Sequence, residues 1–163
     1  MDCGGARIMN EFELWKIGAP SVLVVDARST TSLAEVMPPS GSMAVAHLDG
    51  SSMVEADDVF GQFSSALKFP VYFGWNWDAF SDCLRDMSWY PSDRYLIVID
   101  NAEKILLGSA EEREILFSIL RRAVHEWANP LGKPSSEGIP FKVLLLAADE
   151  SVEGLRKDVA GSS

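Results

Sequence analysis

The segment between residues 72 and 90 contains the side chains best suited to a chemical role. It reads YFGWNWDAFSDCLRDMSWY. If residues 77–87 form a helix, Asp78, Asp82 and Asp86 follow one another at intervals of four and form a stripe on one face. Neighbouring carboxylates in such a stripe repel each other by about 0.2–0.5 kcal/mol, and only Asp78 lies near enough to the helix start to gain from the helix dipole. A stripe of this kind suits a surface that binds cationic groups.

Aromatic side chains flank the acidic stripe. Tyr72 and Trp75 precede the expected helix, and Trp89 follows it. Exposed aromatic residues beside charges are enriched in protein interfaces. Arg85 borders the stripe and lies three residues after Asp82, so it can neutralise that carboxylate in part. These neighbours favour a protein-binding surface, while a solvated helix face remains the alternative interpretation.

No motif in the chain predicts catalysis or metal binding. The sequence has no GxGxxG, GxxxxGK[ST], HExxH or GxSxG motif. Of its two histidines, His47 lies in an apolar segment and is expected to be structural, and His125 lies near the end of an expected helix, where the dipole favours it. Asp78 and Asp82 could share a divalent cation, but local spacing fixes no histidine or third carboxylate beside them. We expect no catalytic residue, no metal and no cofactor. An enzyme that uses Asp78 and Asp82 remains an alternative function.

Composition restricts the classes of partner. The chain has 163 residues, 47% of them apolar, and its 24 acidic and 14 basic residues give a net charge of −10. Such a polyanion is repelled by nucleic acids and by anionic membranes, so a basic protein is the expected partner. Cys3 and Cys83 form no CxxC motif, and neither a signal peptide nor an apolar run of 18 residues is visible. We therefore expect a cytoplasmic protein.

The hydrophobic pattern predicts an α/β fold. Residues 11–26 are two apolar stretches around Gly18-Ala19-Pro20-Ser21 and indicate an N-terminal β-hairpin, followed by a Ser/Pro-rich linker over 29–42. The next segments have the order β-α-α-β-α-α-β, with elements expected at 43–50, 57–68, 77–87, 95–100, 102–107, 109–128 and 141–148. This order predicts a three-stranded parallel sheet packed with helices. We expect an extension over 1–42, an α/β domain over 43–149 and a frayed tail over 150–163.

Capping residues mark the expected helix starts. Asp57 and Asn76 are candidate N-caps for the first two helices, and Ser109 with Glu112 forms a capping box for the long one. In the second helix the apolar face contains Trp77, Phe80, Leu84 and Met87. Cys83 follows Asp82 toward this core side, so we interpret it as a small buried apolar residue.

The segment FPVYFGWNWDAFSDCL, residues 69–84, resembles the barstar family of intracellular inhibitors of the ribonuclease barnase. The positions that meet the family pattern are Pro70, Tyr72, Phe73, Gly74, Asn76, Asp78, Ala79, Asp82, Cys83 and Leu84. The resemblance extends over about 43–149. It implies a three-stranded parallel sheet with helices, in agreement with the order of elements inferred from the hydrophobic pattern.

The resemblance also implies a mechanism. Family members plug the active site of a ribonuclease before its export, using the second helix and the loop before it. Tyr72 and Gly74 would belong to that loop, Asp82 would occupy the phosphate site and pair with Arg and His side chains, and Asp78 and Glu126 match further acidic positions. Together with the neighbours inferred from the residues, the expected partner-binding set is Tyr72, Gly74, Trp75, Asp78, Ser81, Asp82, Arg85, Trp89 and Glu126. The expected complex is a 1:1 heterodimer of a monomer with a basic nuclease.

Several positions depart from the family pattern. Ser81 stands where barstar has an aromatic contact, Arg122 where it has an acidic residue, and Met87 where it has another aromatic. The first forty residues and the proline-rich loop over 129–140 are additions. These differences favour a basic nuclease other than barnase as the target. The alternative is an interaction module of the same fold that binds a basic protein other than a nuclease.

Overall fold

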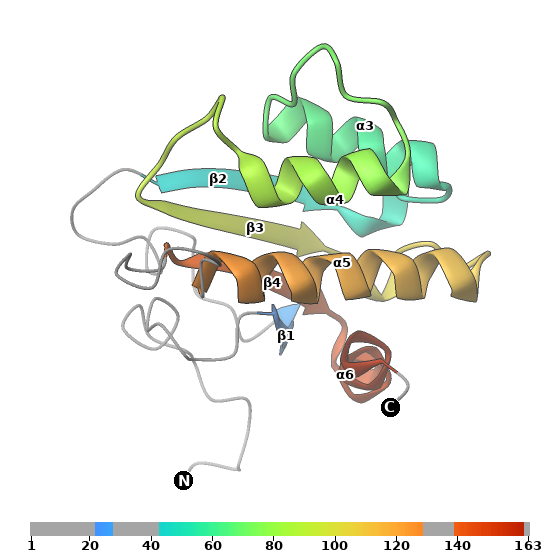
Figure 1. Ribbon diagram of the computed structural model, residues 1–163. Helices are drawn as coiled ribbons and strands as arrows, with labels where there is room; N and C mark the ends of the chain where they lie inside the picture. The colour runs from blue at the N-terminus through green and yellow to red at the C-terminus, as the bar shows by residue number, and fades with distance from the viewer. Residues whose placement is uncertain (1–21, 28–42, 129–138, 162–163) are drawn as a thin grey trace, which may run out of the picture.

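A computed structural model describes residues 22–27, 43–128 and 139–161. Its centre is a parallel sheet of four strands in the order β1-β4-β3-β2 (Figure 1). The strands are β1 (Val22–Asp26), β2 (Met43–Asp49), β3 (Arg94–Asp100) and β4 (Phe141–Ala147). The expected α/β fold, a parallel sheet packed with helices, and the order of elements from 43 onwards are confirmed, but the sheet has four strands rather than three. All seven residues of β4 are buried, because it lies between β3 and β1 rather than at the edge of the sheet.

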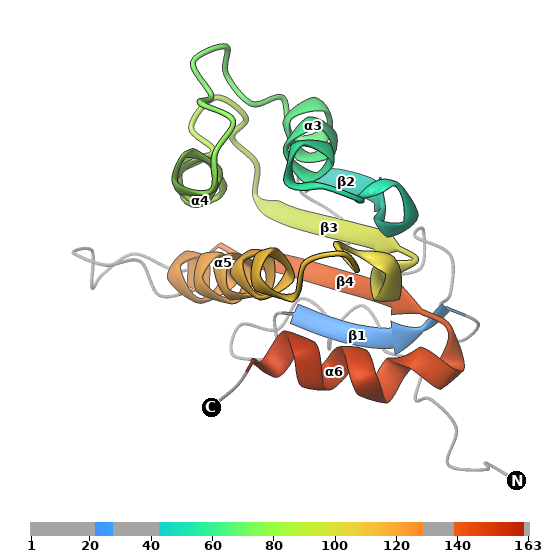
Figure 2. The same cartoon turned by 90° about the vertical axis from the view of Figure 1, so that its right-hand side faces the viewer.

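The helices pack on one face of this sheet. They are α3 (Ala56–Ala66), α4 (Trp77–Asp86), α5 (Ala110–Ala128) and α6 (Val152–Ala160), with short 3₁₀ turns η2 (Gly50–Ser52), η3 (Ala102–Lys104) and η4 (Asp149–Ser151). Residues from all four helices and from alternate positions of all four strands form one core cluster. The other face of the sheet contains a second cluster, made of Leu96, Val98, Leu144 and Leu146. In Figure 2 the strands follow one another from β2 down to β1, with α3 beside β2 and α6 beside β1.

Both ends of the described chain differ from the sequence-based expectation. The second stretch of the expected hairpin is β1, which pairs in parallel with β4 in the register Val24↔Leu145; the first stretch lies outside the described residues. The tail is not frayed over 152–160 but forms α6. Val152, Leu155 and Val159 recur at helical spacing and are buried in the core. Cys3, the linker 29–42 and most of the 129–140 loop lie outside the described residues.

Two of the three predicted helix starts are confirmed. The Asn76 Oδ1 accepts from the Ala79 N–H at 2.8 Å at the start of α4, and the Ser109 Oγ accepts from the Glu112 N–H at 3.2 Å at the start of α5. Asp57 is not an N-cap, because α3 begins one residue earlier, at Ala56, and its N-cap is Glu55. There the Asp58 Oδ2 accepts from the Glu55 N–H at 2.9 Å and stabilises the first turn.

Candidate protein-binding surface

Helix α4 is oriented by its apolar face. Phe80, Leu84 and Met87 are buried, and Trp77 packs against the same core. The Phe80 ring lies with its centroid 4.9 Å from that of Phe63. The predicted apolar face is thus confirmed, and burying it forces the opposite face outward. Along that opposite face the three predicted aspartates are all exposed: Asp78, Asp82 and Asp86.

The loop before α4 is shaped by backbone geometry. Asn76 not only caps the helix but also donates from its Nδ2 to the Gly74 carbonyl at 3.2 Å. A Cβ at Gly74 would lie 3.1 Å from that Nδ2, so a side chain at this position would crowd the cap. Trp75, between them, has the left-handed backbone conformation with φ of 53°. At the other end Met87, with φ of 52°, ends the helix and donates from its N–H to the Cys83 carbonyl at 3.2 Å.

The same loop presents large apolar side chains to solvent. Tyr72 is 73% exposed and Trp75 is 51% exposed. Phe73, between them in sequence, is buried and its ring centroid lies 5.6 Å from that of Trp75. Val71 is fully exposed and was not predicted as a site residue; its position between Pro70 and Tyr72 is the signal that could have identified it. Exposed apolar side chains on an anchored loop fit a binding surface.

Trp89 is less exposed than Tyr72 and Trp75. It is half-buried, its Nε1 donates to the Leu67 carbonyl at 3.1 Å, and its ring centroid lies 5.8 Å from that of Phe69. These contacts attach the segment after α4 to the end of α3. Its membership of the partner-binding set stays a prediction.

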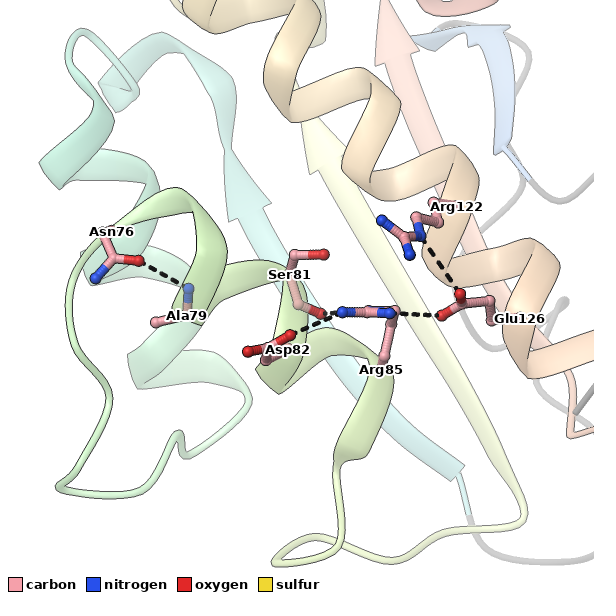
Figure 3. A network of polar contacts seen from close by, with 7 residues as sticks. All are labelled: Asn76, Ala79, Ser81, Asp82, Arg85, Arg122 and Glu126. Carbon is pink, nitrogen blue, oxygen red and sulfur yellow. Dashed lines mark hydrogen bonds and ion pairs between the residues drawn. The ribbon is translucent and has the colours of Figure 1, made fainter. Parts of the chain in front are cut away.

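Arg85 connects α4 to α5 through a network of charges (Figure 3). Its Nη2 lies 2.7 Å from the Asp82 Oδ1, its Nη1 lies 3.3 Å from the Glu126 Oε2, and its Nε donates to the Ser81 carbonyl at 3.3 Å. The predicted pairing of Arg85 with Asp82 is confirmed. On α5, the Arg122 Nε lies 3.4 Å from the Glu126 Oε1. The structure therefore brings Ser81, Asp82, Arg85 and Glu126 of the predicted set together, with Arg122 beside them.

A tryptophan on α5 fixes the distance between the two helices. The Trp127 Nε1 donates to the Leu84 carbonyl at 2.7 Å. Its ring stacks with that of Phe141 on β4, with centroids 5.8 Å apart. Trp127 donates a hydrogen bond to α4 and stacks on the sheet. Because Glu126 precedes Trp127 in the sequence, these contacts hold Glu126 close to Arg85.

Cys83 lies on the inner side of α4, as predicted. It is 6% exposed and is a free thiol. Burial, with smaller contributions from the carboxylates of Asp86 and Asp82, raises the pKa of the Cys83 thiol above its ordinary value. The thiol therefore stays protonated at neutral pH, which suits a packing residue better than a reactive one.

The two histidines lie on β2 and α5. His47 was expected to be a structural histidine; its side chain is half-exposed on β2 and has a partner within the fold, on β3. It lies 2.7 Å from the Asp100 Oδ2 through its Nε2. It is exposed despite its apolar neighbours because alternate residues of β2 face opposite sides of the sheet. His125 is exposed near the end of α5.

Two further observations concern metal binding and the membrane. Within 22–27, 43–128 and 139–161, no three His, Cys, Asp or Glu side chains are grouped so that they could hold a metal ion. Over the same residues, every helix is too short or too polar to cross a membrane.

Comparison with known proteins identifies the class to which this fold and surface belong. The family model described as Barstar (barnase inhibitor) matches residues 43–146, and the chain therefore belongs to the barstar family. The match runs from β2 to β4 and includes α4, the loop before it and α5, whereas β1 and α6 lie outside it. A search of curated proteins gave no match. The family consists of nuclease inhibitors rather than enzymes, and its members bind a nuclease partner.

Proposed function

We propose that this protein inhibits a basic nuclease, in particular a ribonuclease, by plugging its active site with α4 and the loop before it. The observation that carries the proposal is the exposed stripe of three aspartates beside the exposed rings of Tyr72 and Trp75. Nucleases are basic where they bind phosphate, and a carboxylate can replace a phosphate by bidentate pairing with arginine. The stripe supplies the charge, and the rings supply apolar area that can exclude water.

Asp82 is the centre of the proposed contact. It lies midway along the stripe, and its side chain is 74% exposed although it pairs with Arg85. A partner's arginine can therefore approach the carboxylate without first opening the fold. Once the complex excludes water, the pairing becomes much stronger than at an open surface. Asp78 and Tyr72 are secondary contacts, and Asp86 lies one turn further on, toward the rim.

The net charge of −10 has a kinetic role in this proposal. A strongly acidic inhibitor is attracted to a basic nuclease over distances of about the Debye length, which is roughly 8 Å at physiological salt. Fast capture matters for a protein that protects the producing cell in its cytoplasm from a nuclease before export or after delivery as a toxin. The complex proposed is a 1:1 heterodimer without a cofactor.

An RNA-cleavage assay with defined nucleases tests this proposal. The panel contains small basic ribonucleases, nuclease toxin domains and the product of any nuclease gene adjacent to the gene of this chain. One equivalent of the wild type should stop RNA cleavage by the target. Asp82→Ala should lose inhibition, and Glu153→Ala, which removes an exposed carboxylate on α6, should keep it.

The second candidate is a barstar-family module that binds a basic protein other than a nuclease. The segments outside the matched range, among them β1 and α6, are the observation that supports this second candidate. A tight complex with a basic partner that leaves all nuclease activity unchanged would favour this candidate. Reproducible metal-dependent turnover by the chain alone, lost in Asp78→Ala, would contradict both.

A further inference from the structure

Two arginines interrupt the acidic surface between α4 and α5. Arg85 lies between Asp82 and Glu126, and Arg122 lies on the other side of Glu126 (Figure 3). The formal charges along this chain of contacts alternate as −, +, − and +, so the four groups sum to zero. The surface thus has two parts, an acidic one along α4 at Asp78 and Asp86 and a mixed one between the helices.

Both arginines are accessible to a partner that covers this surface. The side chain of Arg122 is 62% exposed and that of Arg85 is 28% exposed. The side chain of Glu126 is only 23% exposed, and each oxygen of its carboxylate accepts from one arginine. Arg85 uses all three of its nitrogens on α4 and α5. Moving the Arg85 side chain away from a bound partner would break these three contacts. A partner therefore encounters the positive charge of Arg85 at its present position.

We propose that Arg85 and Arg122 determine selectivity: the surface binds a basic protein that carries an acidic side chain among its basic ones, and it rejects a uniformly basic cleft. The position of the surface rests on the proposed function. Like charges placed opposite one another across an interface weaken the wrong complex, and opposite charges favour the right one. Asp82 then binds a cationic group of the partner, while Arg122 binds a carboxylate beside it.

Barnase, the ribonuclease in the family description, is a suitable probe because a cleft that holds RNA phosphates must be basic. Affinity for barnase is measured by surface plasmon resonance for the wild type and for Arg85→Gln/Arg122→Gln. The double variant should bind barnase at least tenfold more tightly than the wild type. The matched control is Arg156→Gln/Lys157→Gln on α6, which changes the net charge by the same amount and should change affinity by less than threefold. Arg122, Arg156 and Lys157 are exposed and Arg85 is partly exposed, so the variants are expected to fold, and circular dichroism of each variant checks this.

The outcomes separate this proposal from the proposed function. Equal effects of the two double variants, or no binding of barnase by any variant, would overturn the assignment of selectivity to Arg85 and Arg122. Asp82→Ala is measured in parallel against the nuclease that the chain inhibits. If Asp82→Ala abolishes that binding while the arginine variants behave like their control, the proposed function stands and the selectivity proposal fails. If Asp82→Ala has no effect either, both fail.

A double-mutant cycle tests the acidic partner group directly. Each Asp and Glu at the contact surface of the inhibited nuclease is changed to its amide, and binding is measured against the wild type and Arg122→Gln. One of these changes should weaken binding to the wild type about tenfold and binding to Arg122→Gln less than twofold. Equal losses against both chains at every position would contradict the proposed pairing.

Discussion

Helices α4 and α6 contain nearly the same ion pair in different surroundings. In each, an acidic residue precedes an arginine by three positions and the two charges lie 2.7 Å apart, Asp82 with Arg85 on α4 and Glu153 with Arg156 on α6. On α4 the arginine also reaches Glu126 on a second helix, and the loop before the helix exposes Tyr72. On α6 the arginine instead reaches the backbone carbonyl of Val24. The two ion pairs differ in the charges and rings beside them, and we propose that these neighbours, rather than the exposed pair itself, define the binding surface on α4.

The largest expected difference between the two pairs is in binding. Asp82→Ala should weaken binding to the target nuclease by about 2–5 kcal/mol or more, because it removes a desolvated carboxylate and leaves the partner's cation without its counter-charge. Glu153→Ala should change the binding free energy by less than about 0.5 kcal/mol. Isothermal titration calorimetry gives both values. Similar losses in the two variants would mean that net charge, and not the α4 surface, drives binding.

The inner face of α4 should make the stability of the fold depend on pH above neutrality. The pKa of the buried Cys83 thiol is raised in the folded state, so its contribution to stability is present below the unfolded pKa of about 8.5 and is lost as pH rises through the folded value. The free energy of unfolding should therefore decrease above about pH 8.5, and less steeply in Cys83→Ala. Urea unfolding between pH 7 and pH 10 measures this.

Cys83→Ala also separates packing from binding. At neutral pH it should cost about 1 kcal/mol of stability, because a buried sulfur atom is removed, and it should leave nuclease binding nearly unchanged. Weaker binding without a loss of stability would place Cys83 in the contact surface.

The smallest expected effect is on the stability of the free chain. Asp82→Ala removes an exposed ion pair, but it also relieves repulsion from Asp78 and Asp86 and introduces a better helix former. The change in the free energy of unfolding should be within about 0.5 kcal/mol, as for Glu153→Ala. Thermal unfolding of the two variants checks this. A loss above about 1 kcal/mol in Asp82→Ala alone would show that the network with Arg85 and Glu126 stabilises the fold.

The sequence predicted α4 well because its signals are local. Asn76 caps the helix, and the apolar residues recur at helical spacing within eleven positions, so both faces of the helix could be inferred. The pairing of Asp82 with Arg85 was predictable for the same reason. The family resemblance supplied Glu126, which no local pattern identifies.

The contacts that the sequence did not predict join distant segments. Arg85 and Glu126 are 41 residues apart, and they meet because Trp127 bonds to the Leu84 carbonyl of α4. His47 and Asp100 are 53 residues apart and meet because β2 and β3 pair in register. Strand β1 gave no signal of its parallel partner β4, since strand pairing is not encoded in either strand alone. Helix α6 was missed although its apolar residues have helical spacing, because the helix is short, contains Gly154 and has no side-chain cap at its start.

The most direct test of the central claim is competition for the nuclease active site. Binding of the wild-type chain to its target nuclease is measured with increasing amounts of a non-cleavable oligonucleotide in that site. If α4 occupies the phosphate site, the apparent Kd should rise in proportion to the oligonucleotide concentration once the site is saturated. An apparent Kd that stays constant with the site fully occupied would show that the chain binds elsewhere and contradict the account.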